Sequence, residues 1–280
     1  MYATPVTAAE IGPFMPNIIE VRDLTKTFGD VRAVDGISFD VGEGEVFAFL
    51  GPNGAGKSTT IKMLTTLLKP TSGSISVAGH DPVSDPDAVR HSFGIVFQDP
   101  AVDDELTAWE NMEFHGVLYG VPKAARRTRI DELLKFVELD DRKNSMVKEF
   151  SGGMRRRLEI ARGLLHTPRI VFLDEPTLGL DPQTRNHMWS YLQELNMRDR
   201  TTVFFSTHYM EEAERVAQRI AIIDHGKIVA IGTADTLKAQ TSTATLEEAF
   251  LALTGKSIRA EEGSSTDRMR MVARAFRRGR

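Results

Sequence analysis

Residues 51–58, with the sequence GPNGAGKS, limit the possible folds of this chain more than any other feature. They match the pattern G-x-x-x-x-G-K-[ST], and they stand between the apolar run 46–50 and a helix-like stretch at 59–68. Glycines in such a loop let backbone N–H groups converge at the start of a helix, where the helix dipole favours negative charge. The sequence therefore predicts a phosphate-binding loop between a buried strand and a helix.

The side chains of this loop have distinct expected tasks. We expect Lys57 to neutralise the β- and γ-phosphates of a nucleoside triphosphate, and Ser58 to ligate Mg²⁺. The residues predicted to bind the nucleotide here are Gly51, Pro52, Asn53, Gly54, Ala55, Gly56, Lys57, Ser58 and Thr59.

Two acidic residues follow a second apolar run. Residues 170–173 are apolar, and Asp174 and Glu175 come directly after them. This pattern is typical of a buried strand that ends at the edge of a sheet where α/β proteins bind ligands. We expect Asp174 to help hold Mg²⁺ and Glu175 to accept a proton from an attacking water molecule.

Strand-like and helix-like stretches alternate along most of the chain, which predicts an α/β fold. Residues 45–50 (EVFAFL) are almost all apolar, as in a strand covered on both faces, whereas 37–41 alternate like a half-buried strand. Further strands are predicted at 74–78, 93–97, 170–173, 202–205 and 220–223.

The stretch from about 99 to 168 departs from this alternation, because its apolar residues recur at helical spacing. They are Ile130, Leu133, Leu134 and Val137, followed by Met154, Leu158, Ala161 and Leu165. We expect a helical subdomain inserted into one α/β domain that covers 18–255.

Local signals predict three further features. Asp181 before Pro182 favours the start of a helix that runs to about Asn196. Thr245 and Glu248 form a capping-box pattern for a helix to about Leu253, and residues 224–227 (DHGK) favour a hairpin turn.

The composition excludes several kinds of protein. The chain has no cysteine, which excludes disulfides, zinc ribbons, iron–sulfur clusters and a cysteine nucleophile. No apolar run approaches 18 residues, so the chain is not expected to cross a bilayer by itself. Residues 1–17 lack the basic start and apolar middle of a signal peptide, and we expect a cytoplasmic location.

The two ends are expected to lie outside the folded domain. Residues 1–17 are predicted to be an N-terminal extension, and 256–280 a basic tail with net charge +5. Two interpretations of the tail remain open. It is either a disordered, solubilising tail or an amphipathic helix that lies on an anionic membrane, with Met269, Val272 and Phe276 on one face.

Ser151, Gly152 and Gly153 open a helix-like stretch through 154–166 and permit two interpretations. In one, Ser151 is an ordinary N-cap with a flexible entry to the helix. In the other, its Oγ and nearby backbone amides bind the γ-phosphate of a nucleotide. Three single residues are equally ambiguous when taken alone, because each has an ordinary structural interpretation: Phe28, Gln98 and His208.

The order of these features resembles the nucleotide-binding subunit of ATP-binding cassette (ABC) transporters. The resemblance covers about 18–254, including the predicted helical insertion. In chain order the motifs are Phe28, 51–58, Gln98, 151–153 (SGG), 173–176 (LDEP), 179–182 (GLDP) and His208. Residues 151–158 (SGGMRRRL) and 245–253 (TLEEAFLAL) look most like the drug-resistance branch, the daunorubicin-type exporters.

This resemblance implies a fold and an assembly. The fold would be a P-loop NTPase core, a RecA-like mixed sheet with flanking helices, joined by an antiparallel β portion and the helical insertion. Two cassettes, identical or paired, would pack head to tail around two ATP molecules with Mg²⁺. Ser151, Gly152 and Gly153 would then contact the nucleotide held by the partner's loop, and Asp181 would couple the two sites.

The resemblance also implies roles for single residues. Phe28 would stack on adenine, Gln98 would help place Mg²⁺ and water, and His208 would bond the γ-phosphate. Glu175, His208 and Lys57 would be the catalytic residues. Two positions depart from the family pattern: Phe28 stands where Tyr is usual, and Met154 where Gln is usual. The preference for ATP over GTP is therefore implied by the family resemblance and not by the residues themselves.

The family's membrane-spanning half is missing from this sequence. The resemblance therefore implies a separate permease, which would hold the cassette at the cytoplasmic face of the membrane and dock near Gln98 and the helical insertion. The acidic segment 99–111 is either a permease contact or a solvated loop.

We expect the chain to power the export of drugs or other hydrophobic compounds. An alternative is a soluble ABC-type ATPase that acts on nucleic acid, ribosomes or cluster assembly. The coiled coils, zinc modules or second cassette typical of such proteins are not found here, so no nucleic acid is expected. An unrelated P-loop kinase or GTPase would leave 151–153 and His208 without a role.

Overall fold

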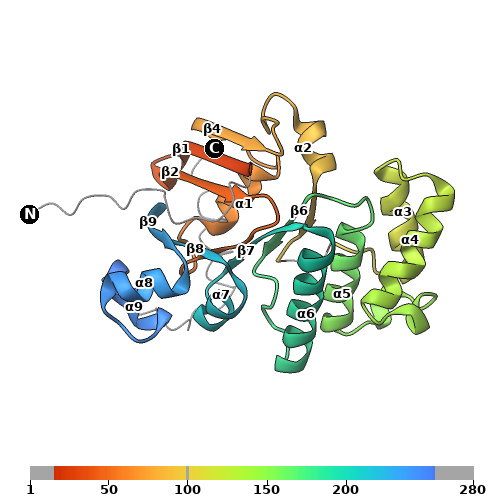
Figure 1. Cartoon of the computed structure of the whole chain (residues 1–280). Coiled ribbons are helices and arrows are strands. Elements are labelled where there is room, and N and C mark those ends of the chain that lie inside the picture. The colour runs from red at the N-terminus through yellow and green to blue at the C-terminus, as the bar shows by residue number, and fades with distance from the viewer. Residues whose placement is uncertain (1–15, 99–100, 256–280) are drawn as a thin grey trace, which may run out of the picture.

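The structure, a computed structural model, describes residues 16–98 and 101–255 (Figure 1). The tail at 256–280 and all but the last two residues of the predicted N-terminal extension lie outside this range. The larger sheet has the strand order β5-β6-β7-β3-β8-β9, and the smaller one β2-β1-β4. The strands are β1 (Asn17–Phe28), β2 (Val31–Gly42), β3 (Val46–Leu50), β4 (Ser72–Val77), β5 (Phe93–Val96), β6 (Ile170–Asp174), β7 (Thr202–Thr207), β8 (Arg219–Asp224) and β9 (Lys227–Gly232).

In the larger sheet the first five strands are parallel and β9 is antiparallel to β8. Every residue of β3 is buried, as expected for a strand covered on both faces. Because side chains alternate along a strand, β3 contributes to two cores. Val46, Ala48 and Leu50 join the core that holds α5 and α6, whereas Phe47 and Phe49 join the core beneath the smaller sheet.

The smaller sheet is antiparallel, and this confirms the expected antiparallel β portion. Its central strand β1 was not among the predicted strands. Several register shifts interrupt its pairing with β2, so the alternation of buried and exposed residues is broken between Val21 and Leu24 and again near Lys26. A sequence pattern of period two therefore does not detect this strand.

The helices are α1 (Lys57–Leu64), α2 (Pro86–Ser92), α3 (Ala108–Leu118), α4 (Lys123–Phe136), α5 (Gly152–Gly163), α6 (Pro182–Asp199), α7 (Met210–Val216), α8 (Ala234–Thr241) and α9 (Leu246–Thr254). The described residues between β5 and β6 form α3, α4, α5 and two short 3-10 turns, Asp140–Arg142 and Val147–Glu149. This confirms the helical insertion. In Figure 1 α3 and α4 stand at the end of the molecule opposite α8 and α9.

Capping residues start several helices where the sequence predicted them. Asp181 caps α6 before Pro182, and Thr245 with Glu248 makes a capping box for α9. The hairpin between β8 and β9 turns at His225 and Gly226. Within the described ranges, no helix is both long and apolar enough to span a membrane.

Helix α5 ends at Gly163, earlier than the predicted 166, and there it passes β5 at very close range. A Cβ atom on Gly94 of β5 would lie only 2.1 Å from the Gly163 carbonyl oxygen. The two backbones can approach this closely only when position 94 carries no side chain. This crossing fixes α5 against the strand that leads to Gln98.

A cluster of half-buried rings lies near this crossing. The Tyr119 ring stacks on His166 with a centroid distance of 4.1 Å and lies 4.5 Å from the His115 ring. His166 Nε2 donates a hydrogen bond of 2.9 Å to the Phe93 carbonyl, which can only accept. Burial is the main cause that lowers the pKa of His115 to about 3 and that of His166 to about 4.

Because the pKa values of these two histidines are lowered, we predict that the protein loses stability in mild acid. Below pH 6.5 these histidines are protonated in the unfolded chain but stay neutral in the folded chain. The free energy of unfolding therefore falls as the pH falls from 6.5 to 4. Each histidine contributes at most about 1.4 kcal/mol per pH unit to this loss. Denaturation at pH 7 and pH 5 should show a smaller pH-dependent loss for His166→Gln than for the unchanged protein. His187→Gln, at an exposed position on α6, is the control, and equal losses for all three proteins would contradict the prediction.

Candidate nucleotide-binding site

A cavity of about 210 Å³ opens where β3, β6 and β7 end. Most of the residues predicted to meet a nucleotide in one protomer contribute to its wall. The lining residues are Ala33, Asn53, Gly54, Gly56, Lys57, Ser58, Thr59, Gln98, Glu175, Leu178 and His208. The cavity therefore brings together residues that are up to 175 positions apart in the sequence, from Ala33 to His208.

The loop between β3 and α1 leaves the start of that helix free for an anion. Gly56 is the N-cap of α1, with φ 108°, and no side chain caps this helix. A Cβ on Gly56 would lie 2.6 Å from the Ala33 carbonyl oxygen, so glycine is required here. By contrast, Ser151, Thr107 and Asp181 cap other helices of the chain through their side chains. An uncapped helix start with a positive dipole end is suited to phosphate.

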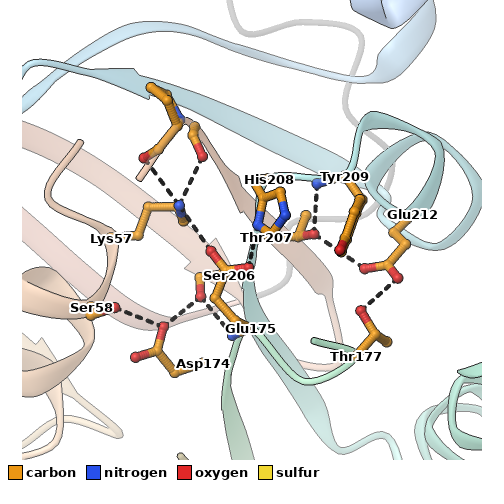
Figure 2. A network of polar contacts seen from close by, with 12 residues as sticks. Lys57, Ser58, Asp174, Glu175, Thr177, Ser206, Thr207, His208, Tyr209 and Glu212 are labelled. Atoms are coloured by element: carbon orange, nitrogen blue, oxygen red, sulfur yellow. Dashed lines mark hydrogen bonds and ion pairs between the residues drawn. The ribbon is translucent and has the colours of Figure 1, made fainter. Parts of the chain in front are cut away.

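Lys57 extends back over its own loop and reaches an acid from another strand. Its side chain is only 5% exposed, and Nζ donates to the carbonyls of Gly51 at 2.8 Å and Pro52 at 3.2 Å. Nζ also lies 2.9 Å from Glu175 Oε1 (Figure 2). Gly51 and Pro52 thus hold the lysine through their backbones, and Ala55 is buried inside the same loop.

Glu175 is held from three sides. Besides Lys57, His208 Nδ1 donates to Glu175 Oε2 at 2.6 Å, and the Glu175 backbone N–H donates to Ser206 Oγ at 3.0 Å. The residue has φ 48°, an uncommon value for a side chain with a Cβ, which the surrounding contacts must maintain. Burial by itself would raise the pKa of Glu175, but the hydrogen bond from His208 and the charge of Lys57 outweigh it and lower the pKa. The carboxylate is therefore ionised at neutral pH and able to accept a proton.

Asp174 and Ser58 meet beside this cluster. Ser58 Oγ donates to Asp174 Oδ1 at 3.1 Å, and Ser206 Oγ donates to the same oxygen at 2.6 Å. A hydroxyl and a carboxylate oxygen suit Mg²⁺, which usually takes one or two protein ligands together with phosphate and water. This fits the finding that, in the described part of the chain, no three His, Cys, Asp or Glu side chains form a metal cage.

Several residues of the network were not predicted from the sequence. Ser206 and Thr207 follow the apolar residues 203–205 of β7, and this polar ending was the available signal. Ser206 bonds to the side chain of Asp174, at the end of β6, and to the backbone N–H of Glu175 just after it. Glu212, 3% exposed, accepts from Thr177 Oγ1 at 2.6 Å and from Thr207 Oγ1 at 3.1 Å. It thereby ties the loop after β6 to the end of β7, as Figure 2 shows.

The remaining predicted residues lie away from the cavity lining. Ser151 Oγ accepts from the Met154 N–H at 3.3 Å, which is the ordinary N-cap geometry. Gly153 packs on Thr184, whose Oγ1 donates to Asp181 Oδ2 at 2.6 Å. Phe28 ends β1 with half of its ring exposed, and the Lys26 ammonium stands 5.1 Å from the ring centroid. These positions are exposed or half-buried and accessible to a ligand or a partner from outside.

The pairing of Lys57 with Glu175 predicts how the nucleotide affinity responds to substitution. A phosphate that binds Lys57 must displace Glu175 Oε1 from it, and the carboxylate also repels the phosphate. Glu175→Gln should therefore bind a non-hydrolysable ATP analogue more tightly, by on the order of threefold to tenfold. Isothermal titration would measure this. Glu212→Gln, which changes another buried carboxylate, is the control, and an unchanged or weaker affinity of Glu175→Gln would refute the competition.

Comparison with known proteins agrees with this geometry. The family model described as ABC transporter matches residues 34–178. The chain is 47% identical to the daunorubicin/doxorubicin resistance ATP-binding protein DrrA of Streptomyces peucetius, over 79% of this chain and 66% of that protein. It is 42% identical to the Nod factor export ATP-binding protein I of Burkholderia lata, over 76% of this chain and 70% of that protein. The chain thus spans about two thirds of the length of these relatives.

Solved structures show the same fold. An ATP-binding subunit of an ABC transporter is 32% identical, with a TM-score of 0.78 over 85% of this chain and 99% of that one. A dimeric ATP-binding cassette, MJ0796, in a post-hydrolysis state with ADP and Pi, is 30% identical, with a TM-score of 0.70 over 77% of this chain and 98% of that one. The expected P-loop NTPase fold is thereby confirmed. The chain belongs to the ABC transporter family, in which it is an ATP-binding subunit that hydrolyses ATP.

Proposed function

We propose that this chain powers an exporter of drugs or other hydrophobic compounds through a head-to-tail dimer that closes on two ATP molecules. The observation that carries the proposal is the cavity in which Lys57, Glu175 and His208 converge beside the uncapped start of α1. Relatives named for drug resistance and for export support the exporter assignment. They also make the alternative, a soluble ATPase acting on nucleic acid, ribosomes or clusters, the less favoured one.

Each residue of the cavity has its own proposed role in ATP hydrolysis. In this proposal the α1 amides and Lys57 bind the β- and γ-phosphates, and Lys57 leaves Glu175 to do so. The freed Glu175 carboxylate accepts a proton from the attacking water, and His208 contacts the γ-phosphate. Ser58, Asp174 and Gln98 hold Mg²⁺, which supplies positive charge to the phosphates when bound. Phe28 offers its exposed ring to the adenine.

The second half of each site comes from the partner copy. Ser151 and Gly152 are exposed at the start of α5, and Asp181 is exposed at the start of α6. We assign Ser151, Gly152 and Gly153 to the nucleotide bound by the partner, and Asp181 to the contact between the two sites. The dimeric state named for the related MJ0796 cassette supports this arrangement. ATP is then part of the interface, and its hydrolysis weakens the dimer.

The dimer proposal is tested with variants at three positions. Glu175→Gln should hydrolyse ATP on the order of a hundredfold more slowly, because it lacks the base, and its mass should double in ATP but not in ADP by light scattering. Mixing Ser151→Arg with Lys57→Ala should restore activity that neither variant has alone, since one composite site in the mixed dimer is intact. Full activity of a strictly monomeric protein, or no recovery on mixing, would overturn the proposal.

We place the permease contact on α3. Phe114, Val117 and Leu118 are exposed apolar residues at i, i+3 and i+4, so they form one face of this helix. The neighbouring acidic segment is a weaker candidate, because Asp104 pairs with Arg155 at 2.8 Å and Glu105 with Lys148 at 3.0 Å. An apolar helix face on the insertion is suited to a cytoplasmic helix of a separate membrane subunit.

This surface predicts a separation of transport from hydrolysis. The double substitution Phe114→Ser with Leu118→Ser should reduce co-purification with the permease tenfold or more and leave the ATPase rate of the isolated subunit unchanged. Met197→Ser, at an exposed methionine on α6, is the matched control. Undiminished co-purification of the double variant would rule out α3 as the contact.

A further inference from the structure

Arg156 on α5 is a buried cation that has no role in the phosphate binding proposed above. It is 7% exposed and lies three residues after Gly153. Its nearest acid is Glu159, 1% exposed, with Nη1 to Oε2 at 3.2 Å. Burying two charges is costly unless each makes further hydrogen bonds. The further hydrogen bonds of Arg156 and Glu159 therefore show which parts of the chain this pair positions.

The Arg156 guanidinium binds the backbone just before and just after the catalytic acid. Nε donates to the Pro176 carbonyl at 2.8 Å, and Nη2 lies 3.4 Å from the Asp174 carbonyl oxygen and 3.5 Å from that of Glu175. These carbonyls belong to the last residue of β6 and to the two residues that follow it, so they lie where the strand gives way to the turn. One planar group with five donors thus holds the turn in which Glu175 has φ 48°.

The same pair also holds both sides of Gln98. Arg156 Nη1 donates to the Phe97 carbonyl, directly before Gln98. Glu159 Oε1 accepts from the Ala101 N–H at 2.6 Å, and Arg162 Nη1 donates to the Ala101 carbonyl. The three side chains stand at i, i+3 and i+6, so they share one face of α5. That face connects the segment around Gln98 to the turn around Glu175.

The first turn of this helix is the segment assigned to the partner's nucleotide. Gly152 and Gly153 begin α5, and Arg156 follows within one turn. A helix moves as a rigid unit over such a distance because each turn is hydrogen-bonded to the next. Any shift of the first turn toward a bound phosphate therefore moves the guanidinium and the carbonyls that it holds.

We propose that Arg156, neutralised by Glu159, is a positioning residue that transmits nucleotide contact at Ser151–Gly153 to Glu175 and Gln98 of the same protomer. This inference rests on the dimer of the proposed function. This role accounts for a buried arginine at a position of α5 where an apolar residue of similar size would be enough for packing. The guanidinium bonds to the backbone of the turn that carries Glu175 and does not line the cavity, so it acts through Glu175.

The experiment compares Arg156→Lys with the matched control Arg155→Lys on the same helix. Lysine keeps the charge beside Glu159 but replaces the planar fork by a single ammonium, which cannot reach all of the carbonyls together. In Arg156→Lys we expect kcat to fall tenfold or more, while the Kd for ATP stays within threefold and Tm within a few degrees of the unchanged protein. Arg155, whose partners are Asp104 and the carbonyls of Lys148 and Phe150, should show no such loss.

A second variant separates positioning from folding. The double substitution Arg156→Met with Glu159→Leu removes both buried charges and is expected to fold. Its kcat should stay at least tenfold low, because the carbonyls remain unheld. A kcat within twofold of normal in a folded Arg156→Lys, or a normal kcat in the double variant, would overturn the inference. Failure of the proposed function is distinguishable, because the unchanged protein itself would then hydrolyse ATP without dimerising.

Discussion

The parallel pairing of β6, β7 and β3 is the constraint on which the rest of this structure depends. Its register places Leu50 opposite Thr207 and Asp174 opposite Ser206, so the three strands end at the same edge. The loop that carries Lys57, the turn that carries Glu175 and the segment that carries His208 all leave from that edge. A slip of one residue in a buried strand would exchange its two faces and disrupt both cores. The stability of the cores therefore enforces the geometry of the site.

The electrostatics of the site follow from burial. Lys57 and Glu175 are both less than a tenth exposed, and each compensates the charge of the other. Lys57 also donates to the carbonyls of its loop, and Glu175 also accepts from His208. In the proposed function a triphosphate competes for Lys57, and Glu175 lines the same cavity. The contact that compensates these two buried charges is thus the one that, in the proposed function, a nucleotide exchanges.

Polar side chains behind the cavity fix the positions of Asp174 and Glu175. Ser206 binds Asp174 and the backbone of Glu175, and Glu212 joins the loops that follow β6 and β7. Arg156 holds the far side of the Glu175 turn from α5. These groups come from different elements, and removing one would leave others buried without partners. The cavity is therefore held by interlocking contacts on the side of β6 and β7.

The sequence by itself determined the α/β class, the phosphate loop, the acidic strand end and the helical insertion. These features depend on local patterns: glycine spacing in 51–58, apolar runs that end in acids, and helical periodicity near Ile130. Strand β1 escaped prediction because register shifts destroy its alternation. The order of motifs also pointed to the family, but only as a resemblance.

Only the tertiary structure decided which charges meet. The ion pair of Lys57 with Glu175, the bond of Ser206 to Asp174 and the bond of Arg156 to Pro176 join residues 20 or more positions apart, and no local pattern encodes such distances. They arise because parallel strands align their ends and because α5 crosses β5 at Gly94. Burial then selects the partner of each charge, since an unpaired ion in the interior would cost more than the fold gains.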